Sequence, residues 1–441
     1  MGQDYLRQLK ITGYCEVIAF ADRNYKEYKN FCPKVIAPTE IKDYEFDYIV
    51  IALRKGISGI RDIKDILKSQ NIDDNKIIEF GERDIAESKN SNNIAESLKK
   101  ELALGKFSSP IIALKSLGAI GDLVFIKRFV VELIRLIPDV HIDFFNMGKF
   151  DICKILYSDL KNIYSFQPDF GGRYEAVAKE YDLALTINSR GYLTMESFKP
   201  EAWENRPELL EKFKLLKQRI ADEGFESLPV PIVVKLRRRY QKYNCYKAFN
   251  YGIFDINDND VNIPINKSVD KNVIEEFKFP YITINCATSA SINTKLISKT
   301  WPVGNFEKVT QLIKANYPDL KILQLGSVDA PRIKNVDGYI LGRDFEYAIS
   351  VLNHSTLHID IEGGLVHVAS QLGTKCIVLF GPTQVDFYGY PNNINLMAGE
   401  CHGCYGVYHD VDRCARFLDE PECMKAITPE MVFEKVNLVL G

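Results

Sequence analysis

The sequence predicts an α/β protein with parallel sheets, divided into a small amino-terminal unit and two larger units in tandem. Its 441 residues exceed the roughly 250–300 residues at which a single hydrophobic core stops growing. Short apolar runs alternate with amphipathic stretches along most of the chain, as strands and helices do in a parallel sheet. Two turns between such segments are rich in glycine, at residues 118–121 and 363–364. Two or three domains are therefore expected.

The first unit, residues 1–84, is expected to be a small Rossmann-like α/β domain. Four runs have strand character: EVIAFAD (16–22), KVIAP (34–38), FDYIVIAL (46–53) and KIIEF (76–80). A Rossmann-like unit opens with a strand that leads into a glycine loop, and Gly2 already lies at that place, so the first strand is expected to be missing. A docking domain is the preferred interpretation, and a nucleotide-binding domain is the alternative.

A polar, helix-prone stretch at residues 85–108 indicates a linker helix, and the second unit follows at 109–278. This unit begins with the apolar strand PIIALKS (110–116) and continues through the loop LGAIGD into an amphipathic stretch at 123–138. The chain then returns in a second strand, VHIDFFN (140–146). The succession predicts a βαβ unit.

The third unit, residues 279–425, has the same character and is followed by a terminal helix at 426–441. Thr428 is suited to cap this helix, with Pro429 at its first position. Four apolar runs have the length of buried strands and alternate with amphipathic stretches: 281–287, 321–327, 356–361 and 375–381. The second and third units are thus predicted to be two Rossmann-like domains.

The turn after the run 356–361 is a candidate anion site. Gly363 and Gly364 have no Cβ atoms to keep a diphosphate away from the backbone, and the helix that follows directs free N–H groups and its positive dipole end there. His367, in the first helical turn, can donate a hydrogen bond to a phosphate oxygen. Taken alone, this pattern indicates only a generic anion cradle at Glu362 to His367.

A second motif, K-x-W-P, lies upstream in SKTWPVGNFEKV. It places Lys299 on a loop at the carboxyl edge of the same sheet, where open α/β sheets bind their ligands. Lys299 and the glycine turn together would neutralise a diphosphate without a metal ion. The alternative is that Lys299 is an ordinary surface lysine.

With these motifs, residues 109–441 resemble the heptosyltransferase family of bacterial glycosyltransferases (glycosyltransferase family 9), whose members have the two-domain GT-B fold. The donor domain of that family carries K-x-W-P, Gln-x-Gly, D-x-G-x-x-H and G-P-T. The matches here are Lys299-Thr-Trp301-Pro302, Gln324-Leu-Gly326-Ser327, Gly364-Leu-Val-His367 and Gly381-Pro382-Thr383. The resemblance implies that these segments and Gly363 bind the nucleotide-sugar donor. Glu362 stands where the family has aspartate, and Asp360 is a nearby substitute.

The loop KSLGAIGDLV resembles the glycine loop of the same family, which ends in an aspartate. The resemblance implies that Asp122 is the general base that takes a proton from the acceptor hydroxyl, with inversion at the anomeric carbon. Gly118 and Gly121 would make room for the donor sugar. The alternative role for Asp122 is structural, because an aspartate at the start of a helix is a good cap.

Four of the ten cysteines are clustered as Cys401-x2-Cys404-x9-Cys414-x8-Cys423. Four thiolates can surround one zinc or iron ion, and a structural ion is favoured because no coordination position is left for a substrate. Four reduced thiols are the alternative. The cluster resembles the four-cysteine iron finger of bacterial protein heptosyltransferases that modify autotransporter adhesins. No catalytic divalent metal is expected.

Composition gives the expected compartment and partners. The net charge of −3 gives no reason to expect nucleic acid as a partner. No run approaches the ~18 apolar residues of a membrane span, and the start lacks the apolar stretch of a signal peptide. We expect a cytoplasmic protein, with peripheral association at the inner membrane as an alternative. The oligomeric state is left open, a homo-oligomer included.

The sequence therefore predicts an inverting glycosyltransferase that transfers a sugar from a nucleotide-sugar to an acceptor. The donor is expected to be ADP-heptose or another nucleoside-diphosphate sugar, and the acceptor a cell-envelope glycan or a protein hydroxyl. One alternative is a sugar-nucleotide 2-epimerase of GT-B fold, which would consume the donor without an acceptor. The other is a non-catalytic scaffold that binds a nucleotide-sugar. Sequence alone leaves the nucleotide, the sugar and the choice between zinc and iron open.

Overall fold

The structure is a computed structural model, and it divides into two compact units. One unit comprises Met1–Lys106 with Gln167–Glu180, and the other Phe107–Phe166 with Tyr181–Gly441. The residues that the structure describes are 16–28, 31–51, 59–73, 76–79, 91–146, 149–169, 172–188, 191–222, 244, 247–256, 261–287, 297–405, 414, 416, 418 and 420–441. Gly2, on which the expectation of a missing strand rests, lies outside them. No helix among these residues is long and apolar enough to cross a membrane.

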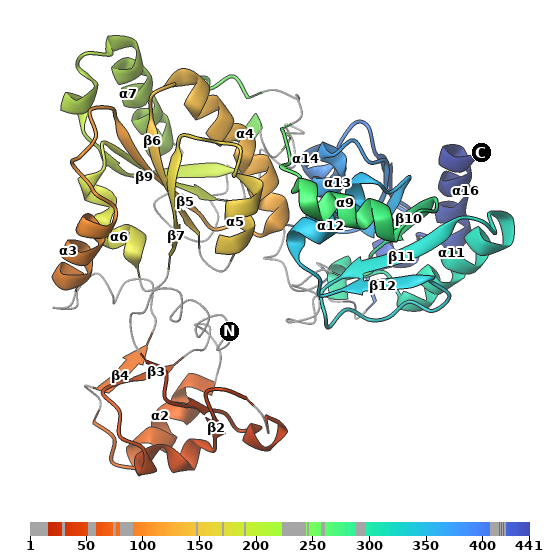
Figure 1. Cartoon of the computed structure of the whole chain (residues 1–441), viewed down its shortest axis with the longest axis horizontal. Helices are drawn as coiled ribbons and strands as arrows, with labels where there is room; N and C mark the ends of the chain where they lie inside the picture. Colours follow the sequence, from red (N-terminus) through yellow and green to blue (C-terminus); the bar gives the residue numbers. More distant parts are fainter. Residues whose placement is uncertain are drawn as a thin grey trace. The chain divides into compact units, whose positions relative to one another are not determined.

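Among its described residues, the first unit holds two pairs of short parallel strands. Strand β1 (Phe20–Ala21) pairs with β2 (Val35–Ile36), and β3 (Ile49–Ile51) pairs with β4 (Ile77–Glu79). The helices of the unit are η1 (Tyr25–Glu27), η2 (Pro38–Asp43), α2 (Gly59–Ser69), α3 (Ser91–Glu101), α6 (Arg173–Val177) and η4 (Ala178–Glu180). The parallel pairing agrees with the strand-and-helix alternation of the sequence (Figure 1).

Helix α3 lies within the predicted linker and packs against α6. Arg173 Nη2 lies 3.1 Å from Glu101 Oε2, and Lys99 Nζ lies 2.9 Å from Glu180 Oε1. Leu98, in the same helix, is buried. The linker helix is therefore anchored within its own unit.

The second unit begins with a five-stranded sheet in the order β7-β6-β5-β8-β9. Its strands are β5 (Ile111–Ser116), β6 (His141–Asn146), β7 (Ile163–Pro168), β8 (Leu183–Asn188) and β9 (Tyr192–Phe198). The helices that accompany it are α4 (Ile120–Leu136), α5 (Phe150–Leu156), η5 (Pro200–Trp203), α7 (Pro207–Asp222) and η6 (Lys247–Phe249). The predicted unit of strand, helix and strand corresponds to β5, α4 and β6.

Strand β9 is antiparallel to β8, which the sequence did not predict. Three residues separate the two strands, and the last of them, Gly191, has a φ of 85° and an N–H that donates to the Asn188 carbonyl. A connection this short produces a hairpin, because a parallel crossover needs a dozen residues or more. Strand β5 is parallel to both β6 and β8, so the antiparallel pair lies at the β9 edge of the sheet.

The second sheet of this unit has six parallel strands in the order β12-β11-β10-β13-β14-β15. They are β10 (Tyr281–Ile284), β11 (Lys321–Gly326), β12 (Gly338–Leu341), β13 (His358–Ile361), β14 (Cys376–Leu379) and β15 (Ile394–Leu396). This is the doubly wound order, in which the winding direction reverses between the two central strands. The reversal lies between β10 and β13, so a ligand site is expected at their carboxyl ends.

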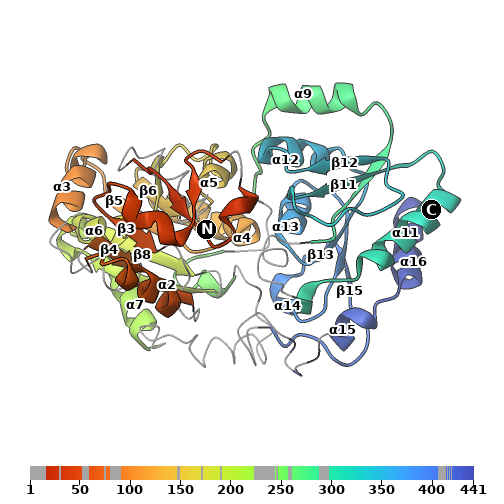
Figure 2. The same ribbon diagram turned by 90° about the horizontal axis from the view of Figure 1, so that it is seen from below.

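Helices cover both faces of the six-stranded sheet (Figure 2). They are α9 (Lys267–Glu276), η7 (Ile297–Lys299), α11 (Val303–Asn316), α12 (Phe345–Asn353), α13 (Gly364–Gln371), α14 (Val385–Tyr388), α15 (Glu422–Lys425) and α16 (Pro429–Leu440). Ile282 and Ile284 of β10 lie in one apolar cluster with residues of α11 and α16. Tyr281 lies in another with residues of α12 and α13, as the alternation of side chains along a strand requires. Thr428 caps α16 as predicted, its Oγ1 accepting from the N–H of Met431 at 3.3 Å.

Candidate active site

The turn from β13 into α13 is held in place by close packing against α4. Gly363 caps α13 in an extended conformation, with φ −171° and ψ −178°. A Cβ on Gly364 would lie 2.9 Å from the Cβ of Ile120 and 3.3 Å from the backbone nitrogen of Gly121. Only glycine fits at position 364 without displacing α4. The amino terminus of α13 therefore lies directly beside that of α4.

Three ionisable side chains and one hydroxyl form a continuous chain at this turn. Lys299 Nζ lies 2.6 Å from Glu362 Oε2, and Glu362 Oε1 lies 3.5 Å from His367 Nε2. His367 Nδ1 lies 2.9 Å from the hydroxyl of Tyr390. Glu362, His367 and Tyr390 are buried, and the Lys299 side chain is 19% exposed. The carboxylate of Glu362 thus bridges the lysine and the imidazole.

Glu362 is held in its ionised form. Burial alone would raise the pKa of its carboxyl, but the charge of Lys299 and the hydrogen bond and charge of His367 outweigh burial and lower this pKa to about 2. Burial would also lower the pKa of Lys299, yet Glu362, Tyr405 and Asp122 together raise it above its ordinary value. Both members of the pair are therefore charged at neutral pH.

The loop that carries Lys299 is anchored by its neighbour Trp301. The indole is 1% exposed, and its N–H donates to the carbonyl of Ile427 at 2.9 Å. The ammonium of Lys299 lies 4.6 Å from the ring centroid of Tyr405 and 5.9 Å from that of Tyr388. The K-x-W-P motif thus consists of a buried anchor and a cation that it positions.

Asp122 is the third residue of α4, and its surroundings bear on both roles that the sequence left open. Its Oδ2 accepts from the N–H of Ala119 at 2.6 Å, which caps the helix. Burial raises the pKa of Asp122 to about 6, while the Ala119 hydrogen bond and the charges of His367 and Lys299 act in the opposite direction. A carboxylate with a pKa near 6 is suited to accept a proton at neutral pH.

Protein atoms fill the space that Gly118 and Gly121 leave open. A Cβ on Gly118 would lie 2.2 Å from the Cβ of Asp122, and one on Gly121 would lie 2.5 Å from Cδ2 of His367. The expectation was that these glycines make room for the donor sugar. In the structure they allow Asp122 and His367 to approach the backbone of the loop.

Gln324, Gly326, Ser327 and Thr383 are not joined to this chain of polar contacts. The side chain of Gln324 is buried, donating to the Pro331 carbonyl at 2.7 Å and accepting from the N–H of Ile333 at 2.8 Å. Ser327 is exposed after β11, and Thr383 is buried in the loop after β14. Gly326 has a φ of 158°, close to extended backbone. Contact of these four residues with a donor stays a prediction.

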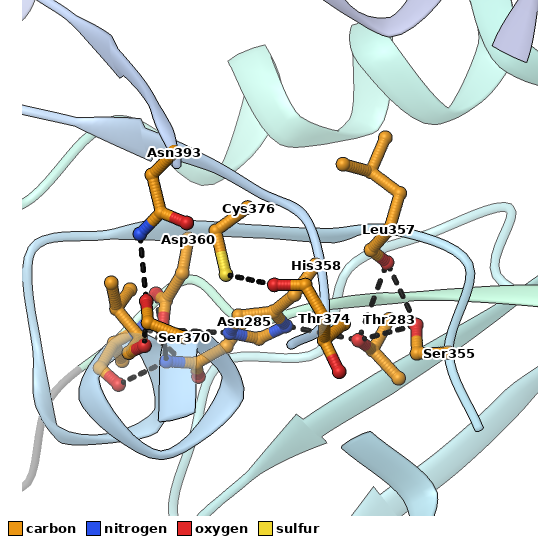
Figure 3. A network of polar contacts seen from close by, with 12 residues as sticks. Thr283, Asn285, Ser355, Leu357, His358, Asp360, Ser370, Thr374, Cys376 and Asn393 are labelled. Carbon is orange, nitrogen blue, oxygen red and sulfur yellow. Dashed lines mark hydrogen bonds and ion pairs between the residues drawn. The ribbon is translucent and has the colours of Figure 1, made fainter. Parts of the chain in front are cut away.

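Asp360 lies in the interior, in the polar network drawn in Figure 3. Its carboxylate accepts from Asn285 Nδ2 at 2.9 and 3.0 Å, and its Oδ2 lies 3.3 Å from His358 Nε2. His358 Nδ1 in turn lies 2.9 Å from the Thr283 hydroxyl. Burial raises the pKa of Asp360, against the effects of His358 and Asn285. The network joins β10 to β13, and within it the carboxylate of Asp360 has protein partners in Asn285 and His358.

The segment that begins at Cys401 is docked onto the loop after β14. The N–H of Gly403 donates to the Gly381 carbonyl at 3.0 Å, and that of Tyr405 donates to the Pro382 carbonyl at 2.7 Å. Cys423 lies near the other three thiols, since Cys401, Cys404 and Cys414 add to burial in raising its pKa to about 12. Among the described residues, however, no three or more His, Cys, Asp or Glu side chains are arranged as ligands of one ion.

Sequence reasoning missed three tyrosines of the site. Tyr390 contacts His367, whereas Tyr388 and Tyr405 flank Lys299. Two of them occur in the segment Y-G-Y-P, just after the G-P-T motif, and the third follows Cys404. Nothing in their spacing points to the site, because each meets a partner from a distant part of the sequence.

Comparison with known sequences gives one family match. Residues 244–404 match the sequence model of glycosyltransferase family 9 (heptosyltransferase). This range includes Lys299, Glu362, His367 and Tyr390. No curated protein sequence matches the chain.

Solved structures share the fold at low identity. The crystal structure of a family 9 glycosyl transferase from Veillonella parvula DSM 2008 is 15% identical, with a TM-score of 0.51 over 76% of this chain and 98% of that one. The E. coli ADP-heptose LPS heptosyltransferase II is 15% identical (TM-score 0.47, 75% and 98% covered). The iron-containing dodecameric glycosyltransferase TibC from enterotoxigenic E. coli H10407 is 14% identical (TM-score 0.49, 75% and 78% covered).

The predicted fold class, an α/β protein of GT-B architecture with parallel sheets, is confirmed. The family match covers the six-stranded sheet and the charged turn at its switch point. On this match and this fold, the protein is a glycosyltransferase that uses a nucleotide-sugar.

Proposed function

We propose that the protein is an inverting glycosyltransferase that moves a heptose from ADP-heptose to a hydroxyl of an envelope glycan or of a protein. The observation that carries the proposal is the meeting of Asp122 with the charged chain of Lys299, Glu362 and His367. The pKa of Asp122 responds to all three of these groups. A proton acceptor thus lies within electrostatic range of a cation and an imidazole donor beside a helix amino terminus.

Each group has a defined part in the transfer. Asp122 takes the proton of the acceptor hydroxyl as its oxygen attacks the anomeric carbon of the donor from the face opposite the leaving group. The bond from the anomeric carbon to the diphosphate breaks, and its electron pair leaves with the nucleoside diphosphate. Lys299, His367 and the amino terminus of α13 stabilise the negative charge that develops there.

Glu362 keeps the side chains of Lys299 and His367 in position before the substrate binds. Its ionised carboxylate holds Lys299 Nζ at 2.6 Å and lies 3.5 Å from His367 Nε2. An aspartate, which the resemblance placed here, is one methylene shorter and would not span both contacts in this geometry. We infer that the longer side chain fixes the spacing between the cation and the imidazole.

Heptose is proposed from the description of the matching family, and ADP from the resemblance to heptosyltransferases that the sequence motifs gave. The class of the acceptor also stays a proposal. So does a location in the cytoplasm, with association at the inner membrane when the acceptor is an envelope glycan. No two of the described cysteines are joined by a disulfide.

A structural zinc or iron ion at Cys401, Cys404, Cys414 and Cys423 is proposed from the chemistry of four neighbouring thiols. The side chains as placed do not form a ligand set, so no catalytic step is assigned to the ion. Elemental analysis of the purified chain, with Cys423→Ser as the comparison, tests it. We expect about one ion per chain in the wild type and less in the variant. Metal-free, fully folded wild type would contradict the proposal.

The test of function is turnover of nucleotide-sugars by the purified full chain, measured as release of nucleoside diphosphate with and without acceptor. We expect ADP-heptose to be consumed fastest and only slowly when no acceptor is present. Equal consumption without acceptor, with an altered sugar nucleotide as product, would identify an epimerase instead. Binding without any turnover would identify the scaffold.

A further inference from the structure

We infer that Tyr390 is a positioning residue that fixes His367 as a hydrogen-bond donor through Nε2, the nitrogen that faces Glu362. Only the catalytic effect of this hydrogen-bond donor, stabilisation of the leaving diphosphate, rests on the proposed function. The contact itself is a buried one, with the Tyr390 hydroxyl 2.9 Å from His367 Nδ1 and both residues less than a tenth exposed.

The ring of His367 is confined from several sides. The Tyr390 ring meets it edge to face, with centroids 5.5 Å apart, and Phe125 approaches at 6.3 Å in the same manner. On the α4 side, Gly121 leaves no room even for a methyl group beside Cδ2. Rotation of the imidazole is therefore restricted, and its two nitrogens keep different neighbours.

The neighbours determine which nitrogen carries the proton. Glu362 faces Nε2 and is ionised, because Lys299 and His367 hold its pKa near 2, so this carboxylate can only accept a hydrogen bond. Nε2 must therefore carry a hydrogen. In a neutral imidazole the other nitrogen then accepts, and the group that faces Nδ1 is a hydroxyl able to donate to it.

Tyr390 is itself held by the strand that follows it. Its carbonyl accepts from the N–H of Asn393 at 3.1 Å and from the side-chain amide of Asn395 at 3.0 Å. Asn395 belongs to β15, which is paired with β14. The backbone of Tyr390 is thus held by the sheet, while the imidazole that its hydroxyl contacts is carried by α13.

A fixed Nε2–H donor matters for transfer because the leaving diphosphate gains negative charge only as the sugar departs. A donor that is already oriented stabilises this charge without reorganisation. Loss of the Tyr390 hydroxyl should therefore lower kcat more than it raises the KM for the nucleotide-sugar.

The test is Tyr390→Phe in the full chain, with Tyr281→Phe as the matched control. Tyr281 is also buried and donates to a carbonyl, that of Val351, at 2.9 Å, at the opposite end of β10 from the site. The first readout is the ¹⁵N spectrum of histidine-labelled protein, at a pH at which the imidazole is neutral. The chain has six histidines, and His367→Gln assigns the signal.

We expect the wild type and Tyr281→Phe to show a single Nε2–H tautomer for His367, and Tyr390→Phe to show a mixture of the two tautomers. A wild-type Nδ1–H tautomer, or an unchanged spectrum in Tyr390→Phe, would overturn the inference. In steady-state kinetics we expect kcat to fall roughly tenfold in Tyr390→Phe with a KM within about twofold of the wild type. If the wild type turns over no nucleotide-sugar, the proposed function fails, but the spectrum still decides the role of Tyr390.

Discussion

Asp122 and Glu362 are two carboxylates of one site whose surroundings shift their pKa values in opposite directions. Burial raises the pKa of Asp122 to about 6 against the effect of its backbone hydrogen bond, whereas Lys299 and His367 lower that of Glu362 to about 2 despite its burial. Two titratable groups that are separated in this way mark different chemical roles. Asp122 is able to exchange a proton near neutral pH, and Glu362 remains a fixed negative charge.

The two turns that carry these residues also differ in their use of glycine. At the start of α4, Gly118 in the preceding turn and Gly121 in the first helical turn allow Asp122 and His367 to pack against the backbone. In the turn before α13, Gly364 allows α4 to approach. These glycines thus allow the amino termini of α4 and α13 to lie close together. The carboxylate of Asp122 comes from α4, and the imidazole of His367 comes from α13.

The largest effect is expected from Asp122→Asn. The amide oxygen can still accept from Ala119, so the helix cap is retained, but the side chain no longer takes up a proton. We expect kcat to fall by about a thousandfold while the donor dissociation constant changes less than about threefold. Transfer kinetics and calorimetric titration with the nucleotide-sugar measure the two quantities. A kcat within tenfold of the wild type would show that Asp122 only caps α4.

The next largest is expected from Lys299→Met, which leaves the carboxylate of Glu362 buried without its strongest partner. We expect kcat/KM to fall roughly a hundredfold and the free energy of unfolding to fall by about 3 kcal/mol. The double variant Lys299→Met, Glu362→Gln should recover stability but not activity. Lys314→Met is the control, since its pair with Asp337 at 3.1 Å lies on the surface and should cost under about 1 kcal/mol. Full activity of Lys299→Met would remove the lysine from the site.

Activity is expected to fall on the acid side near the pKa of Asp122. The carboxyl must be ionised to act as a base, and its raised pKa of about 6 means that it takes up a proton as the pH drops below 6. We expect kcat/KM to be about tenfold lower at pH 5 than on its neutral plateau. Glu362 stays ionised over this range, so donor binding should change little. An acid limb near pH 4 would contradict the shift of Asp122.

The smallest effect is expected from Glu362→Asp, which introduces the aspartate of the resembling family. The shorter side chain can keep its contact with Lys299 or with His367, but not both at their present distances. We expect the KM for the donor to rise roughly threefold to fivefold, with kcat changed by less than about twofold. Steady-state kinetics with saturating acceptor measures both. A variant that equals the wild type would show that the extra methylene has no role in this site.

Much of the fold was predictable because its signals are local. The apolar runs of the six-stranded sheet, the cap at Thr428 and the glycine turn before α13 follow from residues close together in sequence. Strand β9 was missed because its direction depends on the short turn at Gly191 rather than on its own composition. The division into domains between residues 84 and 109 stays a prediction.

The site residues that belong to sequence motifs were predictable. Those that are defined only by contacts between distant segments were not. Lys299, Glu362 and His367 lie together as the motifs suggested. Asp360 looked like a second donor contact, yet Asn285 and His358, from other parts of the sheet, satisfy it in the interior. Tyr390 could not be found from sequence, because its role depends on packing against a helix 23 residues away.

The contrast between the two carboxylates can be measured without any substrate. The ¹³C carboxyl signals of labelled aspartate and glutamate, assigned with Asp122→Asn and Glu362→Gln, report the pKa of each group in the free protein. We predict that Asp122 titrates near pH 6 and that Glu362 remains ionised down to about pH 3, in line with the shifts caused by burial and by Lys299. Titration of both groups together near pH 4 would contradict the assignment of one as base and the other as fixed charge.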